Sequence, residues 1–206
     1  MKLVVISSAE ESPDEIKLVH EMFGLGMEYL HLRKPGYSTS RMEKYLESVD
    51  DQYLNRVIIH SHHELALRYK IGGIHLTQHH RKKKYWRSWL LQKYVRFRKS
   101  KLLVTTGFHT LGALKEEEDL YDYVFLSPVF DSISKVGYRN TFNLQSLSET
   151  LAESRHHVMA LGGVNEERIG QARSLGFYGV AVHGGMWRFS DPVKKFSQIK
   201  LLCEQE

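Results

Sequence analysis

Short runs of apolar and often β-branched residues alternate along this chain with segments of helical pattern. Such alternation predicts parallel strands joined by crossover helices. Strands are expected at Lys2–Ser7, Met27–Arg33, Arg56–Ser61, Gly73–Leu76, Leu102–Thr106, Tyr123–Ser127, His157–Leu161 and Gly179–His183. Helices are expected at Pro13–Phe23, Ser38–Val49, His62–Tyr69, Tyr85–Lys99, Leu111–Glu117, Asn143–Glu153, Glu166–Leu175 and Pro192–Cys203.

Two of these helices carry a start signal. Pro13 follows Ser12, and Pro192 follows Asp191. A capping side chain followed by proline is typical of a first helical turn. Both helices are therefore expected to begin at the proline.

The number of strand–helix units favours a closed barrel. An open doubly wound sheet usually has fewer strands and carries its glycine loop after the first strand. Here the first strand runs into Ile6-Ser7-Ser8-Ala9, which has no glycine. No linker or shift in composition marks a second unit. We expect residues 1–206 to form a single α/β domain, a (β/α)8 TIM barrel.

Late glycine pairs are the first sign of function. Leu161-Gly162-Gly163-Val164-Asn165 and Ala181-Val182-His183-Gly184-Gly185 each end a strand-like run and precede a helix-like one. Glycine lets backbone N–H groups approach a ligand, and a helix N-terminus favours negative charge. TIM barrels build phosphate sites from the loops after these last strands. The pattern predicts binding of a phosphorylated small molecule.

Composition indicates the class of protein and its cellular compartment. Hydrophobic residues make up 42% and charged residues 26%, as in ordinary globular proteins. No apolar run approaches the roughly 20 residues of a membrane span, so no membrane partner is expected. The single cysteine, Cys203, fits a reducing cytoplasm and is expected to be partly buried in the last helix.

The net charge of +5 is concentrated in the middle of the chain. No acidic residue lies between Glu64 and Glu116, whereas cations from Arg81 to Lys101 alternate with aromatics such as Trp86 and Trp89. Such a mixture occurs in nucleic-acid sites. We prefer an amphipathic helix with solvated cations, and expect no nucleic-acid partner. The cations still raise the potential felt by an anionic substrate.

In a TIM barrel the ligand meets residues at the C-terminal ends of the strands. The residues at these expected ends are His31, Arg33, Lys34, His60, Ser61, His75, Gln78, Thr105, Thr106, Ser127 and, in the following loop, Lys135. They are cationic, hydroxyl-bearing or amide-bearing and suit an anion with several oxygens. A carboxylate pair for acid–base catalysis is lacking. The alternatives are a salt bridge for Arg33 and a solvated side chain for Lys135.

Histidines raise the question of a metal. His60, His62 and His63 are close in sequence, as are His75, His79 and His80. Imidazole binds zinc, but the spacing fits no zinc motif, and no cysteine or acidic partner lies nearby. We expect no metal ligands and scattered surface or core histidines.

The motifs, taken in order, resemble the thiamine-phosphate synthase family, which includes TenI-like thiazole tautomerases. Tyr29–Lys34 is similar to the family's Q-L-R-E-K strand, and Gly73–Gln78 to its G-V-H-L-G-Q. Ser127–Lys135 is similar to G-P-V-F-P-T-x-T-K, Ala160–Val164 to A-I-G-G-I, and Gly179–Val182 to the eighth strand. The resemblance spans nearly the whole chain.

The resemblance implies a reaction and roles. Family synthases join hydroxymethylpyrimidine pyrophosphate to thiazole phosphate and release pyrophosphate, with Mg²⁺ and cations neutralising the leaving group. Arg33 and Lys135 would hold the pyrophosphate, and the backbone at Gly162, Gly163 and Gly184 the thiazole phosphate. The remaining expected substrate-binding residues are His31, Lys34, Gln78, Ser127 and Ser134.

This chain departs from the family pattern at its metal ligands. Ser61 and His80 replace the two aspartates that bind Mg²⁺, which prefers oxygen ligands. Lys34 and Pro35 replace a Glu-Lys pair. The acid–base histidine of the tautomerases is replaced by Pro128, and His60 or His109 would have to act for it.

Three functions therefore stay open. The first is a thiamine-phosphate synthase in thiamine biosynthesis with an altered or absent metal site, in which His60, Arg33 and Lys135 are the candidate catalytic residues. The second is a thiazole tautomerase, and the third is a binder of thiazole phosphate or thiamine phosphate without catalysis. All three take phosphorylated small molecules as partners. Exposed helices of small barrels often pair, so a homodimer is left open.

Overall fold

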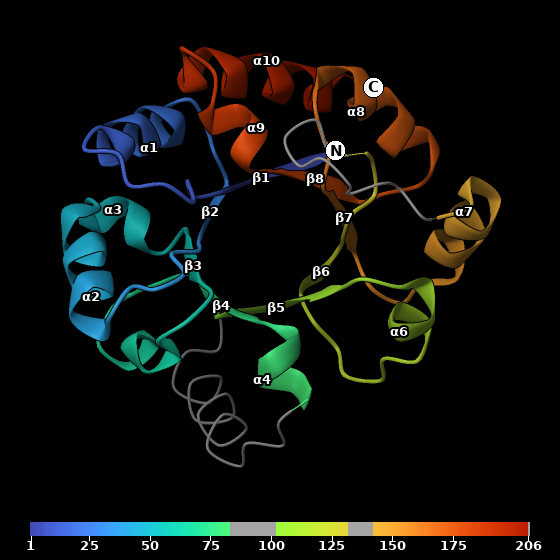
Figure 1. Ribbon diagram of the computed structural model, residues 1–206, viewed down its shortest axis with the longest axis horizontal. Coiled ribbons are helices and arrows are strands. Elements are labelled where there is room, and N and C mark those ends of the chain that lie inside the picture. The colour runs from blue at the N-terminus through green and yellow to red at the C-terminus, as the bar shows by residue number, and fades with distance from the viewer. Residues whose placement is uncertain (83–101, 132–141, 206) are drawn as a thin grey trace.

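The computed structural model describes residues 1–82, 102–131 and 142–205. Eight parallel strands pair in chain order and the last pairs with the first, which closes the barrel (Figure 1). The expected TIM barrel is confirmed. The strands are β1 (Lys2–Ile6), β2 (Tyr29–Leu32), β3 (Val57–Ile59), β4 (Gly73–Leu76), β5 (Leu103–Phe108), β6 (Tyr123–Leu126), β7 (Val158–Leu161) and β8 (Gly179–Val182).

Helices surround the barrel in the described part of the chain (Figure 1). They are α1 (Glu15–Gly24), α2 (Thr39–Ser48), α3 (Asp51–Leu54), α4 (Gln78–Lys82), α6 (Leu111–Lys115), α7 (Leu144–Glu153), α8 (Glu166–Ser174), α9 (Gly184–Trp187) and α10 (Pro192–Glu204). The segment expected as a helix at His62–Tyr69 is a 3-10 helix, η1 (His63–Leu67). The expected helix Tyr85–Lys99, and with it most of the basic segment, lies outside the described residues.

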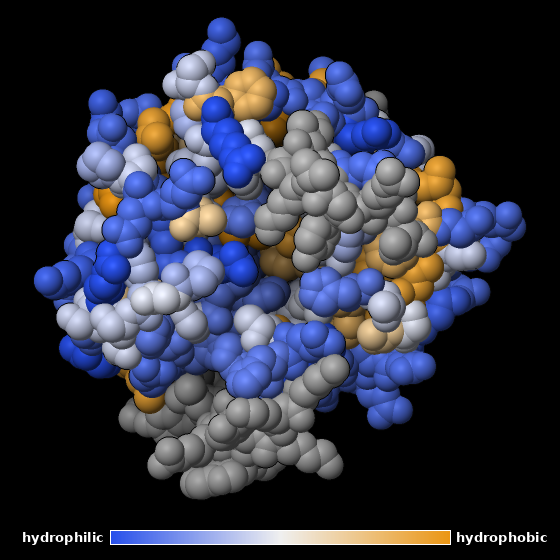
Figure 2. Space-filling view, in the orientation of Figure 1, coloured by the Kyte–Doolittle hydropathy of each residue, from blue (hydrophilic) through white to orange (hydrophobic). Residues whose placement is uncertain are grey.

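Side chains on the strands alternate between two cores, as a strand period of two requires. The barrel interior is filled by residues such as Val4, Ile58, Phe125 and Met159. The larger core lies between the strands and the helices. Among the described helices, none is long and apolar enough to cross a membrane. Figure 2 shows hydrophilic residues over most of the face seen in Figure 1.

The two ends of the chain meet where the barrel closes. β1 pairs with β8 from Lys2↔Gly179 to Val5↔Val182, and the N-terminal ammonium donates to the Cys203 carbonyl at 2.6 Å. Cys203 lies in α10, as expected, but is almost fully buried, with 2% exposure. Burial raises the pKa of its thiol to about 11. The thiol is therefore protonated and unreactive at neutral pH.

Of the two helices expected to begin at a proline after a capping residue, one begins there and the other does not. Asp191 caps α10 by accepting the Lys194 N–H at 2.9 Å, with Pro192 in the first turn. The prediction that Ser12 caps a helix beginning at Pro13 is wrong, because α1 begins at Glu15. The Glu15 carboxylate is buried against Lys34 and accepts the Ser8 N–H. This contact distant in sequence fixes the first residue of the helix.

Candidate functional site

A pocket of about 1450 Å³ opens at the C-terminal ends of the strands. Its walls bring together expected residues from distant parts of the chain. These are Arg33, His60, Gln78, Ser127, Gly162, Gly163 and Gly184. A cavity of this size holds two small substrates, since ligand pockets commonly measure about 300–1,000 Å³.

Both glycine turns reach the pocket, and the first one requires glycine. Gly162 and Gly163 have φ angles of +92° and +66°, which L side chains rarely adopt. A Cβ on Gly162 would lie 2.9 Å from the Pro128 Cα, and one on Gly163 would lie 2.5 Å from the Asp131 carbonyl oxygen. The turn after β7 therefore packs directly against the loop after β6.

The second turn leads into the short helix α9. Trp187 donates its indole N–H to the Ile6 carbonyl at 2.8 Å, which holds α9 over the end of β1. A short extra helix after the eighth strand is a recurrent part of TIM-barrel phosphate sites. Sequence reasoning did not identify this helix, although it did find the glycines that begin it.

Cations line two sides of the pocket. Arg33 follows β2, and the Ser7 hydroxyl fixes its backbone by accepting the Arg33 N–H at 2.9 Å and donating to the Arg33 carbonyl at 3.1 Å. Arg188 lines the pocket just beyond α9. Sequence reasoning missed Arg188, although a cation three residues after the Gly184-Gly185 pair was a usable signal. Lys135 and Ser134 lie outside the described residues.

Lys34 is not part of the pocket, so its expected contact with substrate is wrong. Its side chain is 1% exposed, and its ammonium lies 2.5 Å from the Glu15 carboxylate and 2.8 Å from the Ser8 carbonyl oxygen. Arg33 and Lys34 are adjacent, and successive side chains of an extended backbone point to opposite sides. Burial raises the pKa of Glu15, while Lys34 and the Ser8 N–H oppose that shift.

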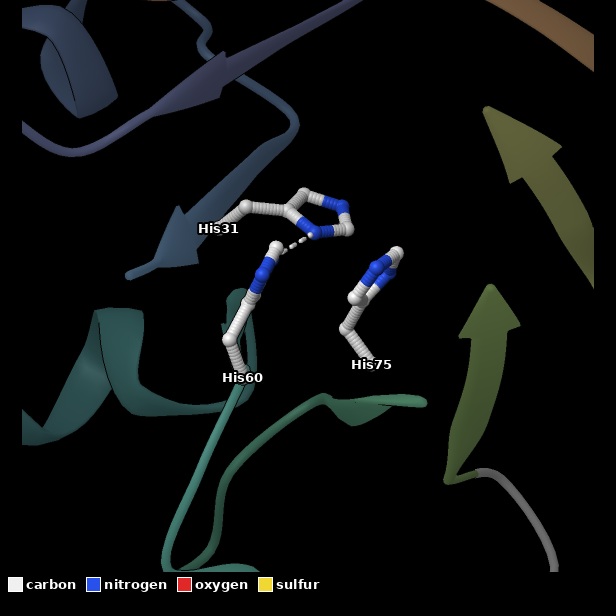
Figure 3. A group of neighbouring side chains, drawn as sticks. All are labelled: His31, His60 and His75. Atoms are coloured by element: carbon white, nitrogen blue, oxygen red, sulfur yellow. Dashed lines mark hydrogen bonds between the residues drawn. The ribbon is translucent and has the colours of Figure 1, made fainter. Parts of the chain in front are cut away.

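Three histidines converge inside the barrel mouth. His31 lies on β2, His60 directly after β3 and His75 on β4, and their rings face one another (Figure 3). His31 Nδ1 lies 2.9 Å from His60 Nε2, and the rings of His60 and His75 stack with centroids 4.0 Å apart. One ring nitrogen of each lies within 4.8 Å of those of the others.

Neighbouring hydroxyls hold these rings. His31 Nε2 lies 2.5 Å from the Tyr123 hydroxyl, and His75 Nδ1 lies 2.9 Å from the Thr105 hydroxyl. All three rings are buried, and His31 is completely so. Burial lowers the pKa of His31 to about 3 and lowers the pKa values of His60 and His75 well below 6.5. The cluster is therefore neutral at physiological pH.

The expectation of scattered histidines is wrong for this cluster. The cluster contains His60 from the group at residues 60–63, His75 from the group at residues 75–80, and His31 from the earlier strand β2. The other group members lie elsewhere: His62 shares a hydrogen bond with the Tyr37 carbonyl, and His63 with the His75 carbonyl. The sequence did contain a signal for this cluster. His31 and His75 alternate with the outward-packing leucines and isoleucine of β2 and β4, so both point into the barrel.

The residues present do not fit a magnesium site of the expected kind. Mg²⁺ requires oxygen ligands, and the ends of β3 and β4 present the imidazoles of His60 and His75. His80 accepts the Thr77 N–H through Nδ1 at 3.2 Å. In the described part of the chain, the carboxylates lining the pocket are Glu166 and Glu167 at the start of α8, and Glu166 pairs with Lys195.

Comparisons with known proteins agree with this geometry. Residues 3–186 match the family described as thiamine monophosphate synthase. The chain belongs to this family. A thiamine-phosphate synthase from Pyrococcus abyssi is 24% identical over 209 residues, covering 100% of this chain and 96% of its own. One from Psychrobacter sp. is 31% identical, but over 90 residues and 42% of either chain.

A solved relative confirms the fold of the synthase family over the full length. The thiamine phosphate pyrophosphorylase from Bacteroides thetaiotaomicron superposes with a TM-score of 0.79 at 26% identity and covers 100% of both chains. The barrel, its strand order and its terminal helix are therefore features shared with this family.

Proposed function

We propose that this protein is a thiamine-phosphate synthase of thiamine biosynthesis that works in the cytoplasm. In this reaction the bond between the pyrimidine methylene carbon and pyrophosphate breaks, and the thiazole nitrogen forms a new bond to that carbon. The observation that carries the proposal is a single pocket shared by Arg33 and both glycine turns in a member of the synthase family. Two phosphorylated substrates need two anion sites, and this proposal places one at Arg33 and the other at the glycine turns.

The thiazole phosphate is assigned to the glycine turns. Gly162 and Gly163 follow β7, and Gly184 begins α9 after β8. Their backbone N–H groups have no side chain between them and the ligand, so they can donate directly to phosphate oxygens. Arg188, on the same wall, adds positive charge beside this anion.

The pyrophosphate is assigned to the part of the pocket around Arg33, beyond the end of β2. Arg33 offers a planar pair of donors that matches two phosphate oxygens. Lys135, proposed from the sequence, would add a second cation. Because negative charge accumulates on pyrophosphate as it leaves, fixed cations stabilise the transition state more than the bound substrate. Gln78 after β4 and Ser127 after β6 add polar groups to the same pocket, which His60 reaches from the histidine cluster.

Condensation of the two phosphorylated precursors tests the proposal directly. The full chain is incubated with both substrates in separate reactions without added metal, with Mg²⁺ and with Zn²⁺, and thiamine phosphate is measured by mass spectrometry. We expect product in at least one reaction. Absence of product in all of them would contradict the proposal, and binding of thiazole phosphate without product would favour a non-catalytic binder.

Arg33→Gln is the matching variant. Removing a charge-assisted hydrogen bond worth about 1.5–3 kcal/mol should lower kcat/KM by roughly 10- to 150-fold. Arg41→Gln is the control, because Arg41 is an exposed arginine that pairs with Glu11 away from the pocket. Equal activity of both variants would remove Arg33 from the pyrophosphate site.

A further inference from the structure

The histidine cluster has a composition that the proposed reaction does not explain. His31, His60 and His75 bring three imidazoles together at the mouth of the barrel, among apolar and hydroxyl-bearing side chains and near the Arg33 guanidinium. We propose that these three residues form a binding site for one divalent transition-metal ion of the zinc class. The inference goes beyond the proposed function, because metal binding is measured without either substrate.

The distances suit such an ion. In a tetrahedral zinc site with Zn–N bonds of about 2.0–2.1 Å, ligand nitrogens lie roughly 3.3 Å apart. Here the nitrogens lie within 4.8 Å of one another, and those of His31 and His60 are 2.9 Å apart. Each ligand is carried by a different strand, and β2 to β4 are adjacent in the barrel. Binding requires rotation of the side chains, since the rings of His60 and His75 are now stacked at an interplanar angle of 17°.

The partners of two rings leave the correct nitrogens available. If His31 donates from Nε2–H to the Tyr123 hydroxyl, its Nδ1 is an unprotonated ligand facing the cluster. If His75 donates from Nδ1–H to the Thr105 hydroxyl, its Nε2 is likewise a ligand. Metal-binding histidines usually donate their other N–H to such a second partner, which fixes the ring and its tautomer. Burial adds to this by keeping the imidazoles neutral.

The site is open on one side. His60 and His75 line the pocket, whereas His31 lies beneath them with no exposed surface. Three protein ligands with one position facing a pocket are typical of catalytic metal sites, in which water or a substrate oxygen completes the shell. Imidazole ligands favour zinc, nickel or copper over magnesium. The same corner of the barrel therefore carries donors for a different class of metal from Mg²⁺.

A hydrogen-bonded histidine network without metal is the competing explanation. The His31–His60 contact of 2.9 Å is also a hydrogen-bond distance. Such a network accounts for His31 and His60, while His75 is held by its hydrogen bond to Thr105 and by stacking on His60. It also predicts that removing one imidazole has no effect on the metal content.

Metal titration of the full chain tests the site. After removal of bound metal with a chelator, the protein is dialysed against Co²⁺, and the visible absorption of tetrahedral Co²⁺ is recorded. We expect one Co²⁺ per chain, displaced by Zn²⁺ and not by Mg²⁺. No saturable binding of Co²⁺ or Zn²⁺ would overturn the proposal.

Three variants and a control locate the ion. His31→Gln and His60→Asn replace each imidazole with a smaller uncharged amide, and circular dichroism checks that both variants fold. We expect each to lower Zn²⁺ affinity by at least about 100-fold, and Thr105→Val to lower it by about 10-fold. His79→Ala removes an exposed histidine of the same pocket and should leave the affinity unchanged.

The outcomes of the variants separate the two proposals. Unchanged Zn²⁺ affinity in both His31→Gln and His60→Asn, or an equal loss in His79→Ala, would overturn the metal site. Failure of the condensation reaction in a protein that binds one Zn²⁺ would reject the proposed function and leave the site intact. Product formation by a protein that binds neither Co²⁺ nor Zn²⁺ would reject the metal site and leave the proposed function intact.

Discussion

At the scale of single residues, adjacent side chains in this protein perform unrelated tasks. Arg33 lines the pocket, whereas the ammonium of Lys34 is buried beside the Glu15 carboxylate behind the strands. A buried ion pair contributes little net stability, but removing one partner leaves an uncompensated charge. Lys34 is thus a structural residue that joins the end of β2 to α1.

Replacing Lys34 should test this assignment. Lys34→Met is expected to lower the free energy of unfolding by about 3–5 kcal/mol, and Glu15→Gln in the same chain should restore much of it. Lys2→Met is the control, because the Lys2–Glu28 pair is exposed and should contribute at most about 1 kcal/mol. Urea unfolding measures all three. Loss of anion binding with unchanged stability in Lys34→Met would return this residue to the site.

At the scale of elements, helix starts are set by caps in some places and by tertiary contacts in others. Asp191 accepts the Lys194 N–H, so local sequence explains where α10 begins. Asp14 occupies the same position at α1 and makes no capping hydrogen bond. There the start is fixed by Glu15, the first helical residue, which is buried and paired.

The two aspartates form a matched pair of tests. Asp191→Ala should cost about 0.5–2 kcal/mol, since a backbone N–H loses its partner. Asp14→Ala should cost no more than a few tenths of a kcal/mol, because it removes no hydrogen bond. Thermal and urea unfolding of both variants measure the difference. Equal losses would show that α10 does not depend on its cap.

At the scale of the whole molecule, the barrel depends on close contact where β8 meets its neighbours. Gly179 pairs with Lys2 of β1 and with Met159 of β7. A Cβ at this position would lie 2.5 Å from the Lys2 carbonyl oxygen and 2.7 Å from the Met159 sulfur. The seam between the first and last strands therefore has no room for a side chain.

Gly179→Ala should weaken the closure of the barrel. Forcing a methyl group into a packed interior typically costs about 1–3 kcal/mol. Gly112→Ala is the control, because a Cβ there meets nothing within 4 Å on the exposed helix α6, and alanine should slightly stabilise the helix. Urea unfolding followed by circular dichroism measures both. A stabilised Gly179→Ala variant would contradict this description of the seam.

Most of the fold could be predicted from the residues, because hydrophobic alternation and helical spacing are local properties. All eight strands were expected within a few residues of their observed bounds. The short helices α3, α4 and α9 were not, since elements of four or five residues carry too little pattern to distinguish them from loops. The turn at Gly162-Gly163 could be found because its positive φ angles restrict the residue type to glycine.

Only part of the candidate site could be predicted from the sequence. From the order of residues come the barrel, the late glycine turns and the cation at Arg33, and from the family resemblance comes the departure from magnesium ligands. Tertiary structure alone decided that Lys34 faces away from the pocket and that His31, His60 and His75 meet. The physical reason is that residues on neighbouring parallel strands are brought together by register and by the inward or outward direction of each side chain, which depend on how the whole barrel closes.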